Sequence, residues 1–116
     1  MDASDIFNRG ASIVRDLILT YEDTGLPIDL DDLDEITFEP IHSVTNRILD
    51  EFTLTGGTVT KVDATAGQAR FIIPQSVSAT AKRGNYLVMA TTEETDILFE
   101  DNNHIRKGLT FCFKLL

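Results

Sequence analysis

The chain has 116 residues, of which 42% are hydrophobic, a length that suits one domain burying roughly two-thirds of the surface that its unfolded chain exposes. Its formal net charge is −9, and no Lys or Arg occurs between Asp16 and Asn46. This distribution argues against nucleic acid as a partner, because phosphate binding needs clustered positive side chains. No apolar run approaches the ~20 residues that cross a membrane, and no signal peptide is visible. The single cysteine, Cys112, excludes an internal disulfide and fits folding in a reducing cytoplasm.

The N-terminal part of the sequence predicts an arm followed by an apolar strand. Residues 1–8 have too little apolar content to fold alone, so we expect a flexible N-terminal arm there and a single β-sandwich domain over residues 9–116. The alternative for residues 1–8 is an edge segment that orders against a neighbour. The dipeptide Arg9-Gly10 predicts a turn into a strand from Ser12 to Tyr21. Because both faces of this strand are partly apolar, the pattern predicts a central strand rather than an edge strand.

The middle of the chain predicts short strands joined by turns. The segment from Ile36 to His42 alternates apolar and polar side chains, and Pro40 marks an end, a bulge or an edge of this strand. The next strand, Ile48 to Leu54, alternates so that three side chains face inward: Ile48, Phe52 and Leu54. The dipeptide Gly56-Gly57 then predicts a hairpin turn that places Leu54 opposite Val59.

The stretch from Gly67 to Ala90 predicts a strand, one helical turn and a second strand. In the first strand, Gln68 to Ile73, the apolar side chains recur with period two: Ala69, Phe71 and Ile73. Pro74 ends this strand, because proline cannot donate to a sheet ladder. We expect Ser76 to cap a helical turn from Val77 to Ala81.

The spacing Gly84-x-Tyr86-x-Val88 after that turn has the layout of a tyrosine corner, in which a tyrosine at the start of a strand bonds to the backbone just upstream. Gly84 suits the positive φ at the exit of the helical turn. We therefore expect the Tyr86 ring to be buried and its hydroxyl to bond to the backbone between Ser76 and Lys82. The fold class that follows is all-β, an immunoglobulin-like antiparallel β-sandwich of about seven to nine short strands with one short helical turn.

The C-terminal part predicts a polar hairpin loop from Thr91 to Thr95, a short strand from Asp96 to Glu100, a turn at Asp101-Asn102-Asn103 and a last strand from Ile105 to Leu116. One face of the last strand is expected to be apolar, with Leu109, Phe111, Phe113 and Leu115 in register. Two interpretations stay open for this strand. It is either an interior strand of the sandwich or an exposed edge whose Phe111, Phe113 and Leu115 form a candidate interface.

No group of residues in the sequence marks an active site or a metal site. The pattern Asp29-x-Asp31 starts like a calcium loop but lacks the oxygen ligand and the glycine that should follow. His42 and His104 have no ligand partner at metal-site spacing and are expected on the surface. Cys112 is expected to be an inert, at least half-buried thiol. The sequence therefore predicts no enzyme, no cofactor and no metal.

Four segments taken together resemble a known family of viral proteins. They are Asn8-Arg9-Gly10-Ala11-Ser12, Asp23-Thr24-Gly25-Leu26-Pro27-Ile28-Asp29-Leu30, Ala66-Gly67-Gln68 and Gly84-Asn85-Tyr86. Their order resembles small tailed-bacteriophage virion proteins of the tail and baseplate, among them the immunoglobulin-like N-terminal domain of siphophage baseplate upper proteins. The resemblance covers residues 8–116. Two positions depart from the family pattern: Ala11 replaces a polar residue, and Asp31 stands where Thr is common.

This resemblance implies a non-enzymatic virion structural protein, a tail, baseplate or fibre-attachment adaptor that docks in a symmetric assembly. It implies other virion proteins and further copies of the chain as partners, and synthesis in the host cytoplasm. Two alternatives stay open, a capsid decoration protein on the head and a carbohydrate- or receptor-binding module. The acidic residues Asp31, Asp32 and Asp34 are a further candidate interface, because local negative charge can steer a basic partner.

Overall fold

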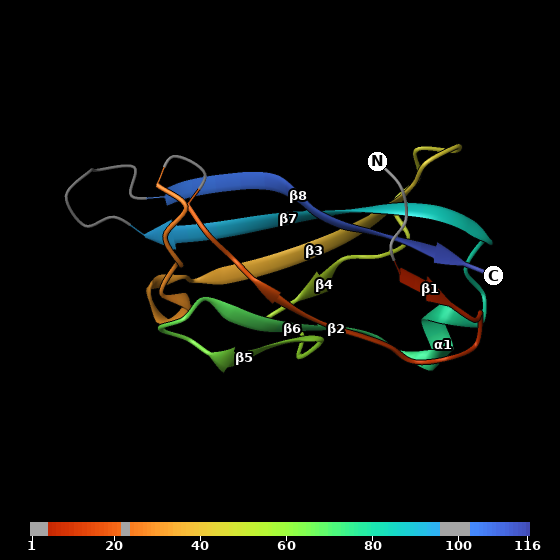
Figure 1. Cartoon of the computed structure of the whole chain (residues 1–116), viewed down its shortest axis with the longest axis horizontal. Helices are drawn as coiled ribbons and strands as arrows, with labels where there is room; N and C mark the ends of the chain where they lie inside the picture. The colour runs from red at the N-terminus through yellow and green to blue at the C-terminus, as the bar shows by residue number, and fades with distance from the viewer. Residues whose placement is uncertain (1–4, 22–23, 96–102) are drawn as a thin grey trace.

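The computed structural model describes residues 5–21, 24–95 and 103–116, without the side chains of residues 95 and 103–106. In this part the strands are β1 (Asp5–Phe7), β2 (Ile13–Ile18), β3 (Glu35–His42), β4 (Phe52–Thr53), β5 (Val59–Asp63), β6 (Gln68–Ile73), β7 (Gly84–Thr95) and β8 (Asn103–Leu115). Two helical turns complete the list, the 3₁₀ turn η1 (Leu30–Asp32) and α1 (Gln75–Ser78). The strands form a five-stranded sheet of order β1-β8-β7-β3-β4 and a three-stranded sheet of order β2-β6-β5, which face each other (Figure 1). The predicted all-β sandwich is confirmed.

The connectivity of the two sheets is that of an immunoglobulin fold. The order β2-β6-β5 reproduces strands B, E and D of that fold, and β8-β7-β3 reproduces strands G, F and C, with β4 added beside C. Two details differ from the prediction. The pair β1 and β8 is parallel, so the sandwich is not wholly antiparallel. Strands β7 and β8 are 12 and 13 residues long, so not all of the strands are short.

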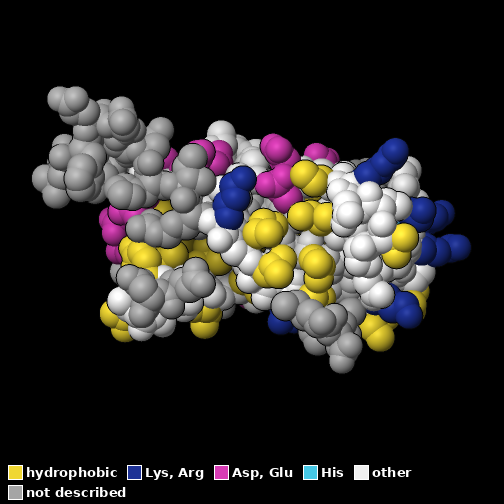
Figure 2. Space-filling view, turned by 90° about the horizontal axis from the view of Figure 1, so that it is seen from above, with side chains coloured by type: hydrophobic (Ala, Val, Ile, Leu, Met, Phe, Trp, Pro, Cys, Tyr) yellow, Lys and Arg dark blue, Asp and Glu magenta, His cyan; other side chains and the backbone are white. Residues whose placement is uncertain are grey.

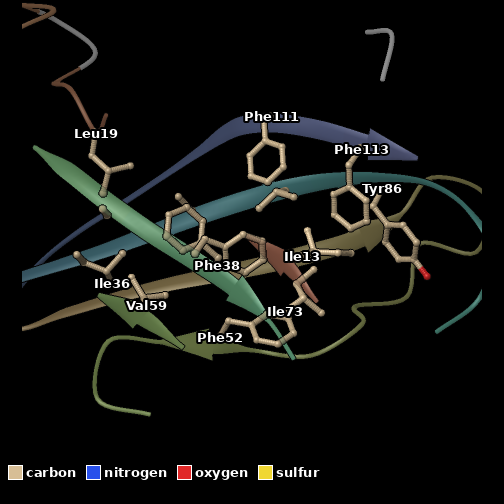
Figure 3. Packing of buried hydrophobic residues seen from close by; sticks show 14 of the residues in the cluster. Ile13, Leu19, Ile36, Phe38, Phe52, Val59, Ile73, Tyr86, Phe111 and Phe113 are labelled. Atoms are coloured by element: carbon tan, nitrogen blue, oxygen red, sulfur yellow. The ribbon is translucent and has the colours of Figure 1, made fainter. Parts of the chain in front are cut away.

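The core lies between the sheets and is rich in aromatic rings (Figure 3). Strand β6 supplies Ala69, Phe71 and Ile73, all fully buried, as its period-two pattern predicted. The Phe71 ring lies at the centre of the aromatic group, with its centroid 5.0 Å from that of Phe38 and 5.3 Å from that of Phe52. Alternation along β6 therefore places an aromatic side chain from the smaller sheet against the larger one.

Strand β2 is an edge strand, so the prediction of a central strand is wrong. It pairs antiparallel with β6, and no other described strand lies on its far side. Its inward face is apolar at Ile13, which is 1% exposed, whereas Val14 and Ile18 on the outer face are 50% and 64% exposed. Apolar side chains on both faces of β2 therefore did not mean that a strand pairs with each of its edges. The apolar side chains on the outer face are exposed to solvent.

The predicted N-terminal arm, residues 1–8, is wrong for its second half. Residues 1–4 lie outside the described part of the chain, but Asp5–Phe7 forms β1 and pairs with Phe113–Leu115 of β8. The pairing is extended by two hydrogen bonds, from Leu116 N to Phe7 O and from Arg9 N to Leu116 O. This segment orders because the backbone groups at the end of β8 offer it a ladder.

Strand β3 continues through Pro40, which lies at a local edge. Its partner on one side is Val88 of β7, and on the other side β4 reaches only Thr37 and Phe38. The Pro40 carbonyl accepts from Leu49 N on the β4 side. Since the N and O of one residue point to the same side of a strand, the missing N–H of Pro40 removes no hydrogen bond to β7.

The segment from Ile48 to Val59 crosses between the sheets, so the predicted hairpin is wrong. Strand β4 pairs with β3, whereas β5 pairs with β6 in the other sheet. The Glu35 carboxylate fixes this crossing, since it accepts from Thr55 N at 3.1 Å and from the Thr55 hydroxyl at 2.5 Å. Burial raises the pKa of Glu35, but these hydrogen bonds outweigh it and leave the pKa below its usual value. Ile48, predicted to face inward, is 50% exposed.

The last two strands form a long antiparallel ladder with one bulge. Thr91–Thr95, predicted as a loop, belongs to β7 and pairs with residues 103–107 of β8. The predicted strand from Asp96 to Glu100, and most of the turn after it, lie outside the described residues. The ladder passes from Val88–Phe111 to Met89–Leu109, so Thr110 is the extra residue of a bulge. The bulge reverses the alternation, and Leu109 is 51% exposed although it was predicted to share the face of Phe111.

Candidate functional site: the open flank of the sandwich

The predicted tyrosine hydrogen bond is present at the start of β7. The Tyr86 hydroxyl donates to the carbonyl of Lys82 over 2.5 Å, and the Tyr86 ring is 2% exposed. Burial raises the pKa of this phenol. The ring also stacks on Phe113 with centroids 5.0 Å apart (Figure 3). Tyr86 thus joins the turn before β7 to the core.

His42 supports the same corner, and its predicted surface position is wrong. The imidazole is 4% exposed, with Nε2 3.0 Å from the carbonyl of Arg83 and Nδ1 accepting from the backbone N–H groups of Val44 and Thr45. This pattern assigns the proton to Nε2. A Cβ at residue 84 would lie 2.8 Å from Nε2, and φ there is +131°, so Gly84 fits both the space and the backbone.

Removal of the Tyr86 hydroxyl should destabilise the fold. We expect Tyr86→Phe to lower the free energy of unfolding by about 1–3 kcal/mol, because the Lys82 carbonyl loses its donor. Since burial raises the pKa of Tyr86, the unfolded chain ionises first, and the stability of the parent should fall as the pH rises above about 10. This alkaline loss should be smaller in the variant. Urea unfolding at neutral and alkaline pH measures both effects, and an unchanged midpoint at neutral pH would contradict the assignment.

The helical turn α1 begins two residues earlier than predicted, at Gln75 rather than Val77, and Ser76 does not cap it. Pro74 occupies the N-cap position without a side-chain hydrogen bond, because the turn starts directly where β6 ends. The serine that matters is Ser78, which is fully buried and accepts from Gly10 N through its hydroxyl at 3.0 Å. This hydrogen bond holds the start of β2 against α1.

The predicted acidic interface lies away from the other predicted residues. Asp31 and Asp32 belong to η1 and are exposed, as is Asp34. The Asp31 carboxylate is 2.9 Å from Lys61 Nζ on β5, the edge of the small sheet opposite β2. Asp29 accepts from the Asp31 backbone N–H as the cap of η1, so its carboxylate has a structural role. Within the described residues, no cluster of His, Cys, Asp or Glu could hold a metal ion.

The apolar candidate interface on the last strand is wrong. Phe111, Phe113 and Leu115 are 7%, 0% and 1% exposed and belong to the core. Strand β8 pairs with β7 along its length and with β1 at Phe113–Leu115, and the three side chains point into the core, so they offer no surface to a partner. Cys112 is buried with a free thiol, and the side chain of His104 lies outside the described part.

The sandwich has an open flank, formed by the free edge of β2. Leu19 N donates to Gly67 O of the strand that pairs with β2, so the backbone groups of odd-numbered residues in β2 point towards β6. The N–H and C=O groups of Val14, Asp16 and Ile18 therefore point away from β6. In the described structure no backbone group pairs with them. An unpaired edge of this kind is a template for a further strand.

A groove of about 1190 Å³ continues the open flank beyond the end of β2. One wall comes from Leu17–Tyr21 together with Thr24, Leu26 and Ile28, the other comes from Lys107–Thr110, and Ala90 and Thr92 of β7 also line it. Leu26 and Leu109 on the rim are 62% and 51% exposed. The Thr92 hydroxyl is buried and has no hydrogen-bond partner among the described residues, a costly state that a ligand in the groove would relieve. Sequence patterns missed this groove because its two walls are about 90 residues apart and meet only in the fold.

The other end of the flank is closed by an ion pair between the sheets. Arg15 points inward from β2, and its Nη1 is 2.6 Å from Oδ2 of Asp5 on β1. Its guanidinium also lies 5.4 Å from the centroid of the Phe111 ring. The pair lies between β1 and β2, and among the described residues the groove lies at the end of β2 remote from β1. The sequence alone did not predict this structural role of Arg15.

The face seen from above in Figure 2 shows hydrophobic side chains gathered between charged ones. On the outer side of the five-stranded sheet, Leu87 and Met89 are half-buried beside exposed Leu109.

No model of a known protein family matches the sequence, and no curated protein matches it. The described part contains no helix long and apolar enough to span a membrane. The fold and the open flank define an immunoglobulin-like sandwich with one unprotected side.

Proposed function

We propose that this protein is a non-enzymatic structural subunit of a bacteriophage virion, an adaptor at the tail, baseplate or fibre-attachment region that acts by docking in a symmetric assembly. The open flank carries this proposal. An unpaired strand edge beside a groove with a buried unpaired hydroxyl suits an extended protein segment, which supplies backbone hydrogen bonds and alternating side chains. The resemblance of residues 8–116 to virion proteins of the tail and baseplate supports the choice of assembly.

The charge of the chain fits docking rather than catalysis. The exposed acidic side chains Asp31 and Asp32 lie at the β5 side of the molecule, so they leave the open flank free while they attract a basic partner over a distance. We expect Asp31→Asn with Asp32→Asn to slow assembly and weaken its salt dependence, while the free energy of unfolding changes by less than about 1 kcal/mol. Light scattering of assembly at low and high salt measures the first effect, and urea unfolding measures the second. A large loss of stability with unchanged assembly would count against this role.

The proposed function is tested with purified particles that carry a tagged copy of the chain. The parent protein should co-purify with virions, and a copy number matching the rotational symmetry of the tail supports the adaptor role, whereas several hundred copies support the head decoration alternative. Leu26→Lys with Leu109→Lys should abolish incorporation by placing charge on the rim of the groove. Val44→Lys is the matched control, because Val44 is also an exposed apolar residue, 81% exposed, and lies in the turn after β3, away from the groove. Absence of the parent from particles would refute the proposal.

A further inference from the structure

We propose that the free edge of β2 pairs with the same edge of a second copy of the chain, antiparallel and centred on Asp16. This inference rests on the proposed function and names the partner at the open flank. The two three-stranded sheets would then form one continuous sheet across a two-fold axis. The argument uses the direction of the backbone groups, the exposed side chains and the charges along this edge.

The backbone of β2 fits this arrangement. Val14, Asp16 and Ile18 are the residues whose N–H and C=O groups point outward. In a ladder centred on Asp16, Val14 faces Ile18 of the second copy, Asp16 faces Asp16, and Ile18 faces Val14. Each of these pairs can exchange two N–H···O bonds, because all of its members are outward-pointing. In this arrangement the outward-pointing N–H and C=O groups of Val14, Asp16 and Ile18 all form hydrogen bonds with the second copy.

The side chains on the outer face favour the same register. Val14 and Ile18 are 50% and 64% exposed, and the ladder places each against the other across the interface. A ladder shifted by two residues places Asp16 opposite Val14, so it leaves a charged side chain against an apolar one. The opposite edge of the small sheet differs, since Lys61 of β5 is already held by Asp31 of η1 at 2.9 Å.

The charges at the centre of the ladder complement each other. Arg70 holds Asp16 through two hydrogen bonds, 2.8 Å from Nε and 3.2 Å from Nη2. The Arg70 hydrogen bond keeps the pKa of Asp16 below its usual value, so this carboxylate is ionised at neutral pH. Two copies would place the charges in the order Arg70, Asp16, Asp16, Arg70. This arrangement is neutral as a whole, because each carboxylate is paired with the guanidinium of its own copy. That pairing reduces the repulsion between the two carboxylates that face each other.

The inference is tested by single-cysteine cross-linking in the Cys112→Ala background, which removes the buried natural thiol. Asp16→Cys should form a covalent dimer under mild oxidation, because residue 16 faces its own copy at a distance that a disulfide spans. Val14→Cys and Ile18→Cys should each stay monomeric alone, yet cross-link when mixed. Thr60→Cys is the matched control, because Thr60 flanks Arg70 on the same exposed face but lies on β5, at the edge opposite β2, and should stay monomeric. Circular dichroism verifies that each variant is folded.

A second measurement does not depend on a new cysteine. Sedimentation equilibrium of the natural chain should show a monomer–dimer equilibrium, and Ile18→Lys should raise its dissociation constant at least tenfold, whereas Val44→Lys should leave it unchanged. Cross-linking of Thr60→Cys as fast as of Asp16→Cys, or a natural chain that stays monomeric at high concentration, overturns the inference. A monomeric chain that still enters virions would overturn this inference alone, and a β2-paired dimer that is absent from virions would overturn the proposed function alone.

Discussion

Phe71→Ala is expected to lower the free energy of unfolding by about 3–5 kcal/mol, the largest loss for any side-chain truncation considered for this fold. Phe71 is fully buried, and its ring contacts rings from three other strands, Phe38, Phe52 and Phe111. Truncation removes the aromatic side chain that β6 presents to the larger sheet and leaves a cavity between the sheets. Because domains of this size are stable by about 5–15 kcal/mol, the variant should be close to unfolded in mild denaturant.

Urea unfolding followed by circular dichroism measures this loss. Val44→Ala is the control, since Val44 is 81% exposed and its truncation should change stability by less than about 0.5 kcal/mol. If Phe71→Ala and Val44→Ala unfold at the same urea concentration, Phe71 cannot lie at the centre of the core. The same comparison also tests the facing of the two sheets, because the partners of Phe71 lie in the larger sheet.

Gly67→Ala should destabilise the protein by more than about 2 kcal/mol through two separate effects. The backbone at Gly67 has φ +72°, a conformation that costs other residues about 1–2 kcal/mol. A Cβ there would also lie 2.6 Å from the carbonyl oxygen of Leu19 and 3.1 Å from that of Ile28. These neighbours are backbone atoms in hydrogen bonds, since Leu19 N donates to Gly67 O and Ile28 N donates to Leu19 O. Movement of the Leu19 and Ile28 backbone away from this Cβ would break the hydrogen bonds that join Gly67, Leu19 and Ile28.

Gly57→Ala is the matched control for this effect. Gly57 has a similar positive φ of +85°, but nothing lies within 4 Å of the position of its Cβ. Its replacement should therefore cost only the backbone strain, about 1–2 kcal/mol. The difference between the two variants in thermal or urea unfolding isolates the close approach at Gly67. Equal losses would show that the Leu19 carbonyl is not in contact with Gly67.

The contact at Gly67 also matters for the open flank. The hydrogen bonds from Leu19 N to Gly67 O and from Ile28 N to Leu19 O hold the segment after β2 on the β6 side of the small sheet. The far side of β2 is thereby left free, and the walls of the groove from Leu17 to Ile28 take their shape. A variant with a disturbed junction should lose docking at the flank as well as stability.

The sequence by itself determined the faces of several strands and the corner between two of them. Alternation in β6 identified the buried side chains, because one face of that strand meets only the core. The spacing from Gly84 to Tyr86 predicted a hydroxyl bond to the backbone between Ser76 and Lys82, and the structure places it at Lys82. This prediction was possible because the bond joins residues four apart and depends on local geometry. These local patterns were sufficient for the all-β fold class and for a buried Tyr86.

The tertiary structure alone decided which strands are neighbours, and therefore where the surface is open. Period two shows which side chains share a face, but it does not show whether a second strand lies beside them. For this reason β2 was predicted as central, and Phe113 at the C-terminal end was left open between core and interface. The bulge at Thr110, the burial of His42 and the meeting of Leu26 with Leu109 at one groove depend on contacts between distant segments. Such contacts are set by packing of the whole chain, and no short stretch of sequence encodes them.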